Sequence, residues 1–287
     1  MKDISSHDLT NNFPLAARSA RQERSVIRVG DAEFGGERVV VIAGPCAVES
    51  REQLLDIARN VKARGASVLR GGAYKPLTFP YRSESMFELG EEGLRYLAEA
   101  SEETGLPVVT EVMDVRLVDM VAGYADVLQI GARNMQNFPL LQEVARVGKP
   151  VLLKRHFGCS LRDWLGAAEY VLHGGNPDVI LCERGIVAPH THQPTSRFIV
   201  DLQAVLAAQE FTHLPVIVDP SHSTFRREYV APIARAAIAA GADGIIMDVH
   251  PTPEQAAVDP LQALSYEAFG TLTEEVRGIA AVIGRES

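Results

Sequence analysis

Residues 215–222 read PVIVDPSH, an apolar, β-branched run that ends in a residue able to bind a metal ion or an anion. The pattern occurs eight times, and the other runs are VVVIAGPC (39–46), SVLRGGAYK (67–75), PVVTE (107–111), VLQIGAR (127–133), PVLLK (150–154), VILCER (179–184) and GIIMD (244–248). In a (β/α)8 barrel, the C-terminal ends of all strands converge on one mouth. The sequence therefore predicts a single site assembled from many distant segments.

Helical patterns separate these runs. Strands are expected at 39–44, 66–71, 107–112, 127–132, 150–155, 178–183, 214–219 and 244–249, and helices at 51–65, 90–105, 114–123, 138–147, 160–173, 196–210, 226–241 and 265–283. Three helical patterns run into a glycine, at Gly65, Gly105 and Gly241, where a C-terminal cap is expected. This alternation predicts an α/β protein with a closed TIM barrel. A doubly wound sheet is disfavoured, because the dinucleotide-binding glycine fingerprint is absent after the first strand.

The chain is expected to hold one domain. Residues 1–24 are polar and patternless, which predicts a flexible N-terminal arm that is disordered or packs on a partner. Residues 25–287 predict a single catalytic barrel that begins with a short hairpin, whose turns would use Gly-Asp and Gly-Gly pairs. Between the barrel strands no interruption is long enough for a domain linker.

Composition narrows the class of protein. The chain has 287 residues, 46% of them hydrophobic and 23% charged, as in soluble globular proteins. The net charge of −9 argues against a nucleic-acid surface, and the lack of a long apolar segment argues against a membrane protein. Three widely spaced cysteines and no secretory segment indicate a reducing cytoplasmic setting.

Four residues could form a metal site. Alone, Cys46 is better explained as a small buried side chain, and His222 as a capping or core histidine. With Asp248 at the eighth strand and Asp259 in the following loop, a shared metal site becomes the better explanation of Cys46 and His222. One thiolate, one imidazole and carboxylate oxygens suit a divalent transition ion such as Mn, Fe, Co or Zn.

Cationic residues follow several of the same strands. Lys75, Arg133, Lys154 and Arg184 could each be an ordinary solvated charge. Together at one mouth they would repel one another unless an anion lies between them, and guanidinium groups match phosphate oxygens well. Arg70 would add a contact for a carboxylate. The pattern indicates a phosphorylated anion held beside a metal ion.

The segments AGPCAVES, LRGGAYKP, TEV, IGARNMQN, LLKR, LCERGI, DPSHS and VHP, with a later Asp, closely resemble a known family. They are similar to the short, type Iβ, 3-deoxy-D-arabino-heptulosonate 7-phosphate (DAHP) synthases, and less similar to the 3-deoxy-octulosonate 8-phosphate synthases. The resemblance implies a metal-dependent, aldol-type condensation of phosphoenolpyruvate with erythrose 4-phosphate, the first step of the shikimate pathway to aromatic amino acids. It also implies a homo-oligomer, either a dimer or a tetramer.

The resemblance assigns roles to individual residues. The implied metal ligands are Cys46, His222, Asp248 and Asp259. The implied contacts of phosphoenolpyruvate are Arg133, Lys154 and Arg184 at its phosphate, with backbone groups near Glu111 and Ala132, and Arg70 and Lys75 at its carboxylate side. Lys75 is also the implied proton donor, so that Lys75, Cys46 and His222 form the catalytic set.

The chain departs from the family on the side of the aldehyde acceptor. The family's Lys-Pro-Arg-Thr loop reads Lys-Pro-Leu-Thr here, a glycine is replaced after strand five, and Asp248 stands where Glu is usual. The residues implied to bind the acceptor are Pro76, Leu77, Thr78 and His156. Arginines that could replace the lost one are Arg82, Arg197, Arg226 and Arg227.

Three alternatives stay open at this point. The chain could condense phosphoenolpyruvate with a different aldehyde in specialised metabolism. It could be a non-catalytic family member, although metal ligands without a function have no packing reason to persist. It could also be a barrel lyase in which Lys154 forms a Schiff base with a 2-keto acid.

Overall fold

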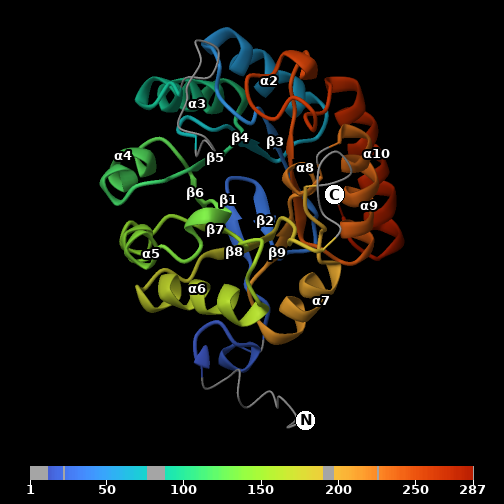
Figure 1. Ribbon diagram of the computed structural model, residues 1–287. Helices are drawn as coiled ribbons and strands as arrows, with labels where there is room; N and C mark the ends of the chain where they lie inside the picture. The colour runs from blue at the N-terminus through green and yellow to red at the C-terminus, as the bar shows by residue number, and fades with distance from the viewer. Residues whose placement is uncertain (1–11, 22, 76–87, 190–196, 225, 287) are drawn as a thin grey trace.

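The computed structural model describes residues 12–21, 23–75, 88–189, 197–224 and 226–286, and its centre is a closed barrel (Figure 1). Eight parallel strands pair in the order β10-β3-β4-β5-β6-β7-β8-β9. Their bounds are β3 (Val40–Gly44), β4 (Val68–Arg70), β5 (Val108–Glu111), β6 (Val127–Ile130), β7 (Val151–Lys154), β8 (Val179–Glu183), β9 (Val216–Val218) and β10 (Gly244–Asp248). The predicted α/β barrel and all eight of its strands are confirmed.

Helices surround the barrel (Figure 1). They are α2 (Arg51–Ala63), α3 (Glu91–Thr104), α4 (Val118–Ala122), α5 (Phe138–Arg146), α6 (Leu161–His173), α7 (Leu202–Phe211), α8 (Pro220–Ser223), α9 (Arg227–Ala239) and α10 (Tyr266–Val282). The glycines predicted to end α2, α3 and α9 all have positive φ, at 98° for Gly65, 71° for Gly105 and 90° for Gly241. The left-handed backbone that a helix C-terminus commonly needs is present at each.

Helix α7 begins later than the sequence pattern predicted. The expected start was residue 196, but the helix starts at Leu202. Ile199 instead forms a β-bridge with Ile186, and the Asp201 side chain accepts a hydrogen bond from the Ala204 amide as an N-cap. The segment before the helix is therefore used to fasten the loop after β8 to the barrel.

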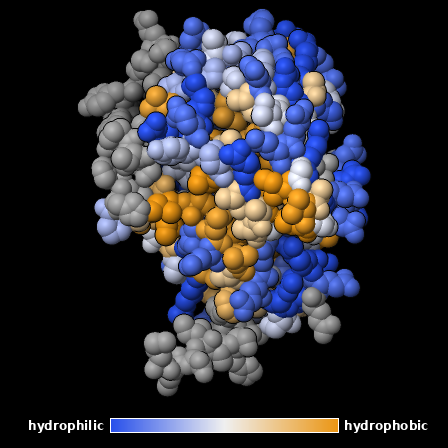
Figure 2. All heavy atoms as spheres, turned by 90° about the vertical axis from the view of Figure 1, so that its right-hand side faces the viewer, coloured by the Kyte–Doolittle hydropathy of each residue, from blue (hydrophilic) through white to orange (hydrophobic). Residues whose placement is uncertain are grey.

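The surface is mostly polar, but an apolar band crosses the face turned toward the viewer in Figure 2. Exposed apolar residues on the helices of the barrel include Leu206 in α7, Tyr229 in α9 and Val282 in α10. Within the described ranges, no helix combines the length and apolar character that crossing a membrane requires.

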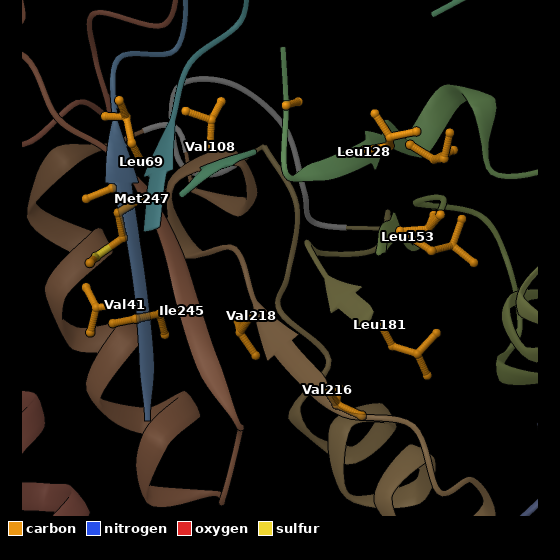
Figure 3. Packing of buried hydrophobic residues seen from close by; sticks show 14 of the residues in the cluster. Val41, Leu69, Val108, Leu128, Leu153, Leu181, Val216, Val218, Ile245 and Met247 are labelled. Carbon is orange, nitrogen blue, oxygen red and sulfur yellow. The ribbon is translucent and has the colours of Figure 1, made fainter. Parts of the chain in front are cut away.

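The core has two layers, separated by the barrel wall. Alternating residues of each strand face opposite sides of it. In β3, Val41 belongs to the cluster that also holds the apolar faces of the helices, whereas Ile42 belongs to the cluster inside the barrel. Figure 3 shows residues of the outer cluster, among them Leu69, Leu153 and Val216, distributed over successive strands.

The predicted N-terminal hairpin is present and packs against the inner layer. Strands β1 (Ile27–Val29) and β2 (Ala32–Phe34) place their buried residues in the cluster inside the barrel. A Cβ added at Gly30 would lie 3.3 Å from Pro107, which directly precedes β5, and one at Gly35 would lie 3.2 Å from Pro215, which precedes β9. The hairpin therefore covers the N-terminal end of the barrel and leaves the C-terminal end for the site.

The stretch before the hairpin packs on the protein's own helices. Phe13 is 6% exposed and Ala16 is fully buried. The Thr212 hydroxyl and the His213 ring contact the carbonyl oxygens of Ala16 and Leu15, at 2.5 Å and 2.7 Å. The arm expected to be flexible over residues 1–24 thus contains a packed stretch, and residues 1–11 lie outside the described part of the chain. The division at residue 24 stays a prediction.

Candidate active site and metal centre

The side chains singled out in the sequence meet at the C-terminal end of the barrel. Arg70, Glu111, Lys154 and Asp248 are the last residues of β4, β5, β7 and β10, and Arg184 directly follows β8. All five are buried, with exposures of 1% to 8%. Charged side chains are seldom buried unless they are paired or hold a ligand. Their convergence therefore marks a functional site rather than a packing feature.

Four ligand atoms form a compact cluster. Cys46 Sγ, His222 Nε2 and one carboxylate oxygen each of Asp248 and Asp259 all lie within 4.8 Å of one another. Cys46 Sγ is 3.6 Å from His222 Nε2 and 3.3 Å from Asp259 Oδ2, and His222 Nε2 is 3.6 Å from Asp248 Oδ2. Ligands about 2.0–2.3 Å from one tetrahedral ion are separated by about 3.3–3.8 Å. The donor set and its spacing fit a single divalent transition ion.

The backbone around two of these ligands is specialised. A Cβ at Gly44 would lie 2.0 Å from the Arg70 carbonyl oxygen, so only glycine allows β3 and β4 to approach as closely just before Cys46. Asp259 has φ of 55°, and no other non-glycine residue in the described ranges has a positive φ. Such a backbone conformation costs roughly 1–2 kcal/mol and often marks a functional position.

Asp219 is a residue of the site that the sequence reasoning missed. It is fully buried and contacts His222 Nδ1 at 2.9 Å and Lys154 Nζ at 2.5 Å. Burial alone would raise the pKa of Asp219, but the positive charges of His222 and Lys154 outweigh it and hold that pKa well below its usual value. A carboxylate on Nδ1 turns Nε2 toward the cluster, as in many metal sites. Its signal in the sequence was its place as N-cap of the one-turn helix α8.

The electrostatics of His222 reflect its carboxylate neighbours. Burial, the largest single effect, lowers the pKa of the ring, but Asp219 and Asp248 outweigh it and raise the pKa to about 9. A metal ion binds the neutral ring, so binding at this position would release a proton.

Among the described residues, buried ion pairs with carboxylates are formed by the predicted cations Arg70 and Lys154. Arg70 forms a buried ion pair with Asp248, and Lys154 forms one with Asp219. Sequence could not show these pairings, because the partners are 178 and 65 residues apart. A Schiff-base lysine needs a free amine, whereas Lys154 is bound to a buried carboxylate. The geometry therefore argues against the lyase alternative.

Lys75 directly contacts the cluster formed by Cys46, His222, Asp248 and Asp259, which is called the metal-type cluster below. Its Nζ donates to the carbonyl oxygen of Cys46 at 2.9 Å and lies 3.2 Å from Cys46 Sγ. Burial lowers its pKa, but the negative groups around it, with Cys46 the strongest, outweigh that effect and raise the pKa above the usual value. Lys75 therefore presents a protonated amine beside the Cys46 sulfur.

Arg184 has the surroundings expected of an anion-binding group. Its guanidinium donates to the carbonyl oxygen of His222 at 3.2 Å and lies 4.5 Å from the centre of the Phe198 ring. In the part of the chain described here, no carboxylate forms an ion pair with it. Burial lowers its pKa, and the nearby charges of Arg197 and Arg133 act in the same direction. Three guanidinium groups thus converge where an incoming phosphate would be stabilised.

Glu111 and Ala132 lie at the same end of the barrel, at the C-terminal ends of β5 and β6. The Glu111 carboxylate accepts a hydrogen bond from Gln129 Nε2 at 3.2 Å. A Cβ at Gly131 would meet Glu111 Oε1 at 2.0 Å, so the glycine leaves room for that side chain. Ala132 and Arg133 follow in a short 3-10 helix, and Arg133 is exposed at the mouth.

The acceptor side is described in part. Pro76, Leu77 and Thr78 lie outside the described residues. The His156 ring lies 4.1 Å from the ring of Phe157, and burial together with the charge of Arg184 lowers its pKa. His156 is thus placed on the Arg184 side of the mouth.

A second missed feature supports the loop that carries Asp259. The Glu49 carboxylate accepts hydrogen bonds from the Ala257 amide at 2.9 Å and from Gln53 Nε2 at 3.1 Å, and lies 3.4 Å from His250 Nε2. These contacts fasten the loop after β10 to the start of α2. No local sequence motif revealed them, because the partners lie about 200 residues apart.

Known proteins share this architecture. The model of the family described as DAHP synthetase I matches residues 20–282. A phospho-2-dehydro-3-deoxyheptonate aldolase of Thermotoga maritima is 46% identical over 272 residues, which cover 95% of this chain and 79% of that protein. A 2-dehydro-3-deoxyphosphooctonate aldolase of Syntrophotalea carbinolica is 30% identical over 277 residues, covering 90% of this chain and 96% of that protein.

Solved structures agree. The crystal structure of the Thermotoga maritima phospho-2-dehydro-3-deoxyheptonate aldolase (DAHP synthase) superposes with a TM-score of 0.89 at 45% identity, covering 95% of this chain and 77% of that one. A truncated form of 3-deoxy-D-arabino-heptulosonate 7-phosphate synthase from Thermotoga maritima gives a TM-score of 0.88 at 44% identity, covering 96% and 99%.

Fold and site define a class, namely (β/α)8 barrels with a thiol, imidazole and carboxylate cluster beside buried cations. The family model matches most of the chain, and the most similar relatives named above align over nearly all of it. The chain belongs to the DAHP synthetase I family.

Proposed function

We propose that this chain is a transferase that condenses phosphoenolpyruvate with erythrose 4-phosphate to give DAHP and inorganic phosphate, the step that opens the shikimate pathway. The supporting observation is that the residues able to hold a metal ion lie at the same barrel mouth as the buried cations Arg70, Lys154 and Arg184. Lys75 contacts Cys46 of the first group. The Thermotoga maritima relatives described above are named as DAHP synthases, whereas the Syntrophotalea carbinolica relative is named for an eight-carbon product.

The metal would be a divalent Mn, Fe, Co or Zn ion held by Cys46, His222, Asp248 and Asp259. Such an ion polarises a carbonyl group and stabilises the negative charge that develops on its oxygen. Asp219 fixes the direction of the His222 ring, and Arg70 fixes one oxygen of Asp248 through their ion pair.

The remaining charged groups would bind phosphoenolpyruvate. Arg184 and Arg133, with Lys154, bind its phosphate near the backbone at Glu111 and Ala132, and the donors of Arg70 and Lys75 face its carboxylate. Cations placed in advance in a site shielded from water lower the free energy of the transition state more than solvent would. The phosphate group is thereby held while its bond to C2 weakens.

The atoms balance in three steps. C3 of phosphoenolpyruvate bonds to the aldehyde carbon, and the aldehyde oxygen takes a proton that Lys75 is placed to supply. Water adds to C2, and inorganic phosphate leaves to give the 2-keto group. The product is the 3-deoxy-2-keto sugar acid.

A phosphate-release assay tests the proposal. Purified chain with phosphoenolpyruvate, erythrose 4-phosphate and Mn²⁺ should release one phosphate per phosphoenolpyruvate consumed, and chelation should stop it until metal is returned. Release that needs no aldehyde, or none in the complete mixture, would contradict the proposal.

The acceptor is proposed to lie near His156 and the stretch Pro76, Leu77 and Thr78. The chain is also proposed to form a homo-oligomer, a dimer or tetramer, since extended apolar surface is uncommon on monomers. A cytoplasmic setting is proposed because its cysteines, all of them free, include the ligand Cys46, which binds metal only when reduced. Light scattering that gives the mass of one chain would overturn the oligomer.

A further inference from the structure

Arg197 lies between the metal-type cluster and the outer rim of the mouth. Its Nη1 is 3.6 Å from Asp259 Oδ1, while Asp259 Oδ2 faces Cys46 and His222. The Arg197 side chain is 25% exposed. One end of Asp259 therefore faces the proposed metal, and the other faces a guanidinium that solvent can reach.

Phe198 holds this guanidinium in place. The Arg197 guanidinium lies 5.5 Å from the centre of the Phe198 ring, and that of Arg184 lies 4.5 Å from the same centre. The ring is stacked on Phe157 at 5.2 Å with an interplanar angle of 22°, and the Phe198 amide donates to the Ser223 carbonyl at 2.8 Å. A rigid ring thus sets the separation between an inner and an outer arginine.

The other two described arginines that could replace the family's lost arginine, Arg226 and Arg227, have partners away from the metal-type cluster. Arg227 donates to the carbonyl oxygens of Ala263 and Pro260 and pairs with Glu254. Arg226, the N-cap of α9, packs on Tyr229 and pairs with Glu228, which both lie in the first turn of that helix. Arg197, by contrast, has within the described ranges one long ionic contact, to Asp259, beside its contact with the Phe198 ring.

We infer that Arg197 binds the phosphate of the aldehyde acceptor, with Phe198 as its positioning residue. The inference rests on the proposed function. An aldose phosphate carries its carbonyl group and its phosphate at opposite ends. With the carbonyl at the metal cluster, the phosphate would reach outward along Asp259 to Arg197, while Arg184 stays with phosphoenolpyruvate. The site would therefore select aldehydes with a terminal phosphate.

Kinetics of Arg197→Ala test this assignment. In the Mn²⁺-loaded enzyme, the KM for erythrose 4-phosphate should rise about 10–100-fold, the effect of one charge-assisted contact, with the KM for phosphoenolpyruvate within about twofold. Erythrose without phosphate should react equally with both proteins. Arg64→Ala, which removes a guanidinium at the same 5.5 Å from a ring, that of Tyr266, is the matched control and should leave both KM values unchanged.

A measurement that does not depend on turnover distinguishes two roles of Arg197, namely binding the acceptor phosphate and supporting the metal site through Asp259. Calorimetric Mn²⁺ affinity should be the same in Arg197→Ala and the parent protein. Phe198→Leu should raise the KM for erythrose 4-phosphate several-fold with little change in kcat. A lowered Mn²⁺ affinity, a raised KM for phosphoenolpyruvate, or an unchanged KM for erythrose 4-phosphate would overturn the inference. If the parent protein itself turns over no erythrose 4-phosphate, the proposed function fails as well.

Discussion

Asp219→Asn would test how the metal cluster is held together. The substitution keeps the shape of the side chain but removes the charge that pairs with Lys154 at 2.5 Å and with the His222 ring at 2.9 Å. The Lys154 and Asp219 side chains are 5% and 0% exposed, so an uncompensated buried ammonium would remain. Breaking a buried pair in this way costs about 3–5 kcal/mol. Loss of the carboxylate that orients a ligating histidine typically lowers metal affinity about 10–100-fold.

Two measurements check these numbers. Denaturant unfolding should show the loss of stability, and titration calorimetry with Mn²⁺ should show the loss of affinity. Asp119→Asn, which breaks the exposed ion pair of Asp119 with Arg146, is the control and should change neither beyond error. Unchanged Mn²⁺ affinity in Asp219→Asn would refute the orienting role, and unchanged stability would refute the importance of the buried pair.

Three further predictions concern the ligands, the acceptor and the N-terminal segment. Cys46→Ser should lower Mn²⁺ affinity by more than Asp219→Asn does and remove nearly all turnover; full activity after chelation and return of Mn²⁺ would count against the ligand assignment. Because Arg197 is inferred to bind the acceptor phosphate already, Leu77→Arg should lower the KM for erythrose 4-phosphate strongly in the Arg197→Ala background and little in the parent protein, and an equally strong fall in both would contradict the Arg197 assignment. Burial lowers the pKa of His213 below its ordinary value of about 6.5, so the folded protein favours the neutral ring. The free energy of unfolding should therefore be highest above about pH 6.5 and fall as the pH drops from 6.5 toward the lowered pKa. His213→Gln should flatten this decline in unfolding experiments, and an equally steep decline in the variant would contradict it.

Much of the fold could be predicted because the barrel strands are short β-branched runs between turn residues, and that signal is local. Helix α7 shows where local patterns fail. Its apolar spacing continues back to residue 196, yet Ile199 pairs with Ile186 across the loop, and a tertiary bridge replaces the first turns. The capping residue Asp201 was the available clue to the true start.

The sequence could predict which residues meet at the barrel mouth, but not which of them form ion pairs there. Strand ends of a barrel must meet, so the proximity of Cys46 and His222 followed once the strands were placed. The Arg70–Asp248 pair and the role of Asp219 did not follow, because they depend on how side chains turn inside the mouth. Phe198 was also not predicted, because its role depends on contacts of its ring with Arg184 and Arg197, and only the fold brings the three residues together.

The most direct test is a crystal of the reduced protein with Mn²⁺ and phosphoenolpyruvate, measured by anomalous diffraction at the Mn edge. The anomalous peak should lie about 2.0–2.6 Å from Cys46 Sγ, His222 Nε2 and oxygens of Asp248 and Asp259, with the phosphate of phosphoenolpyruvate against Arg184. An ion bound elsewhere, or phosphoenolpyruvate bound away from Arg184, would contradict the account.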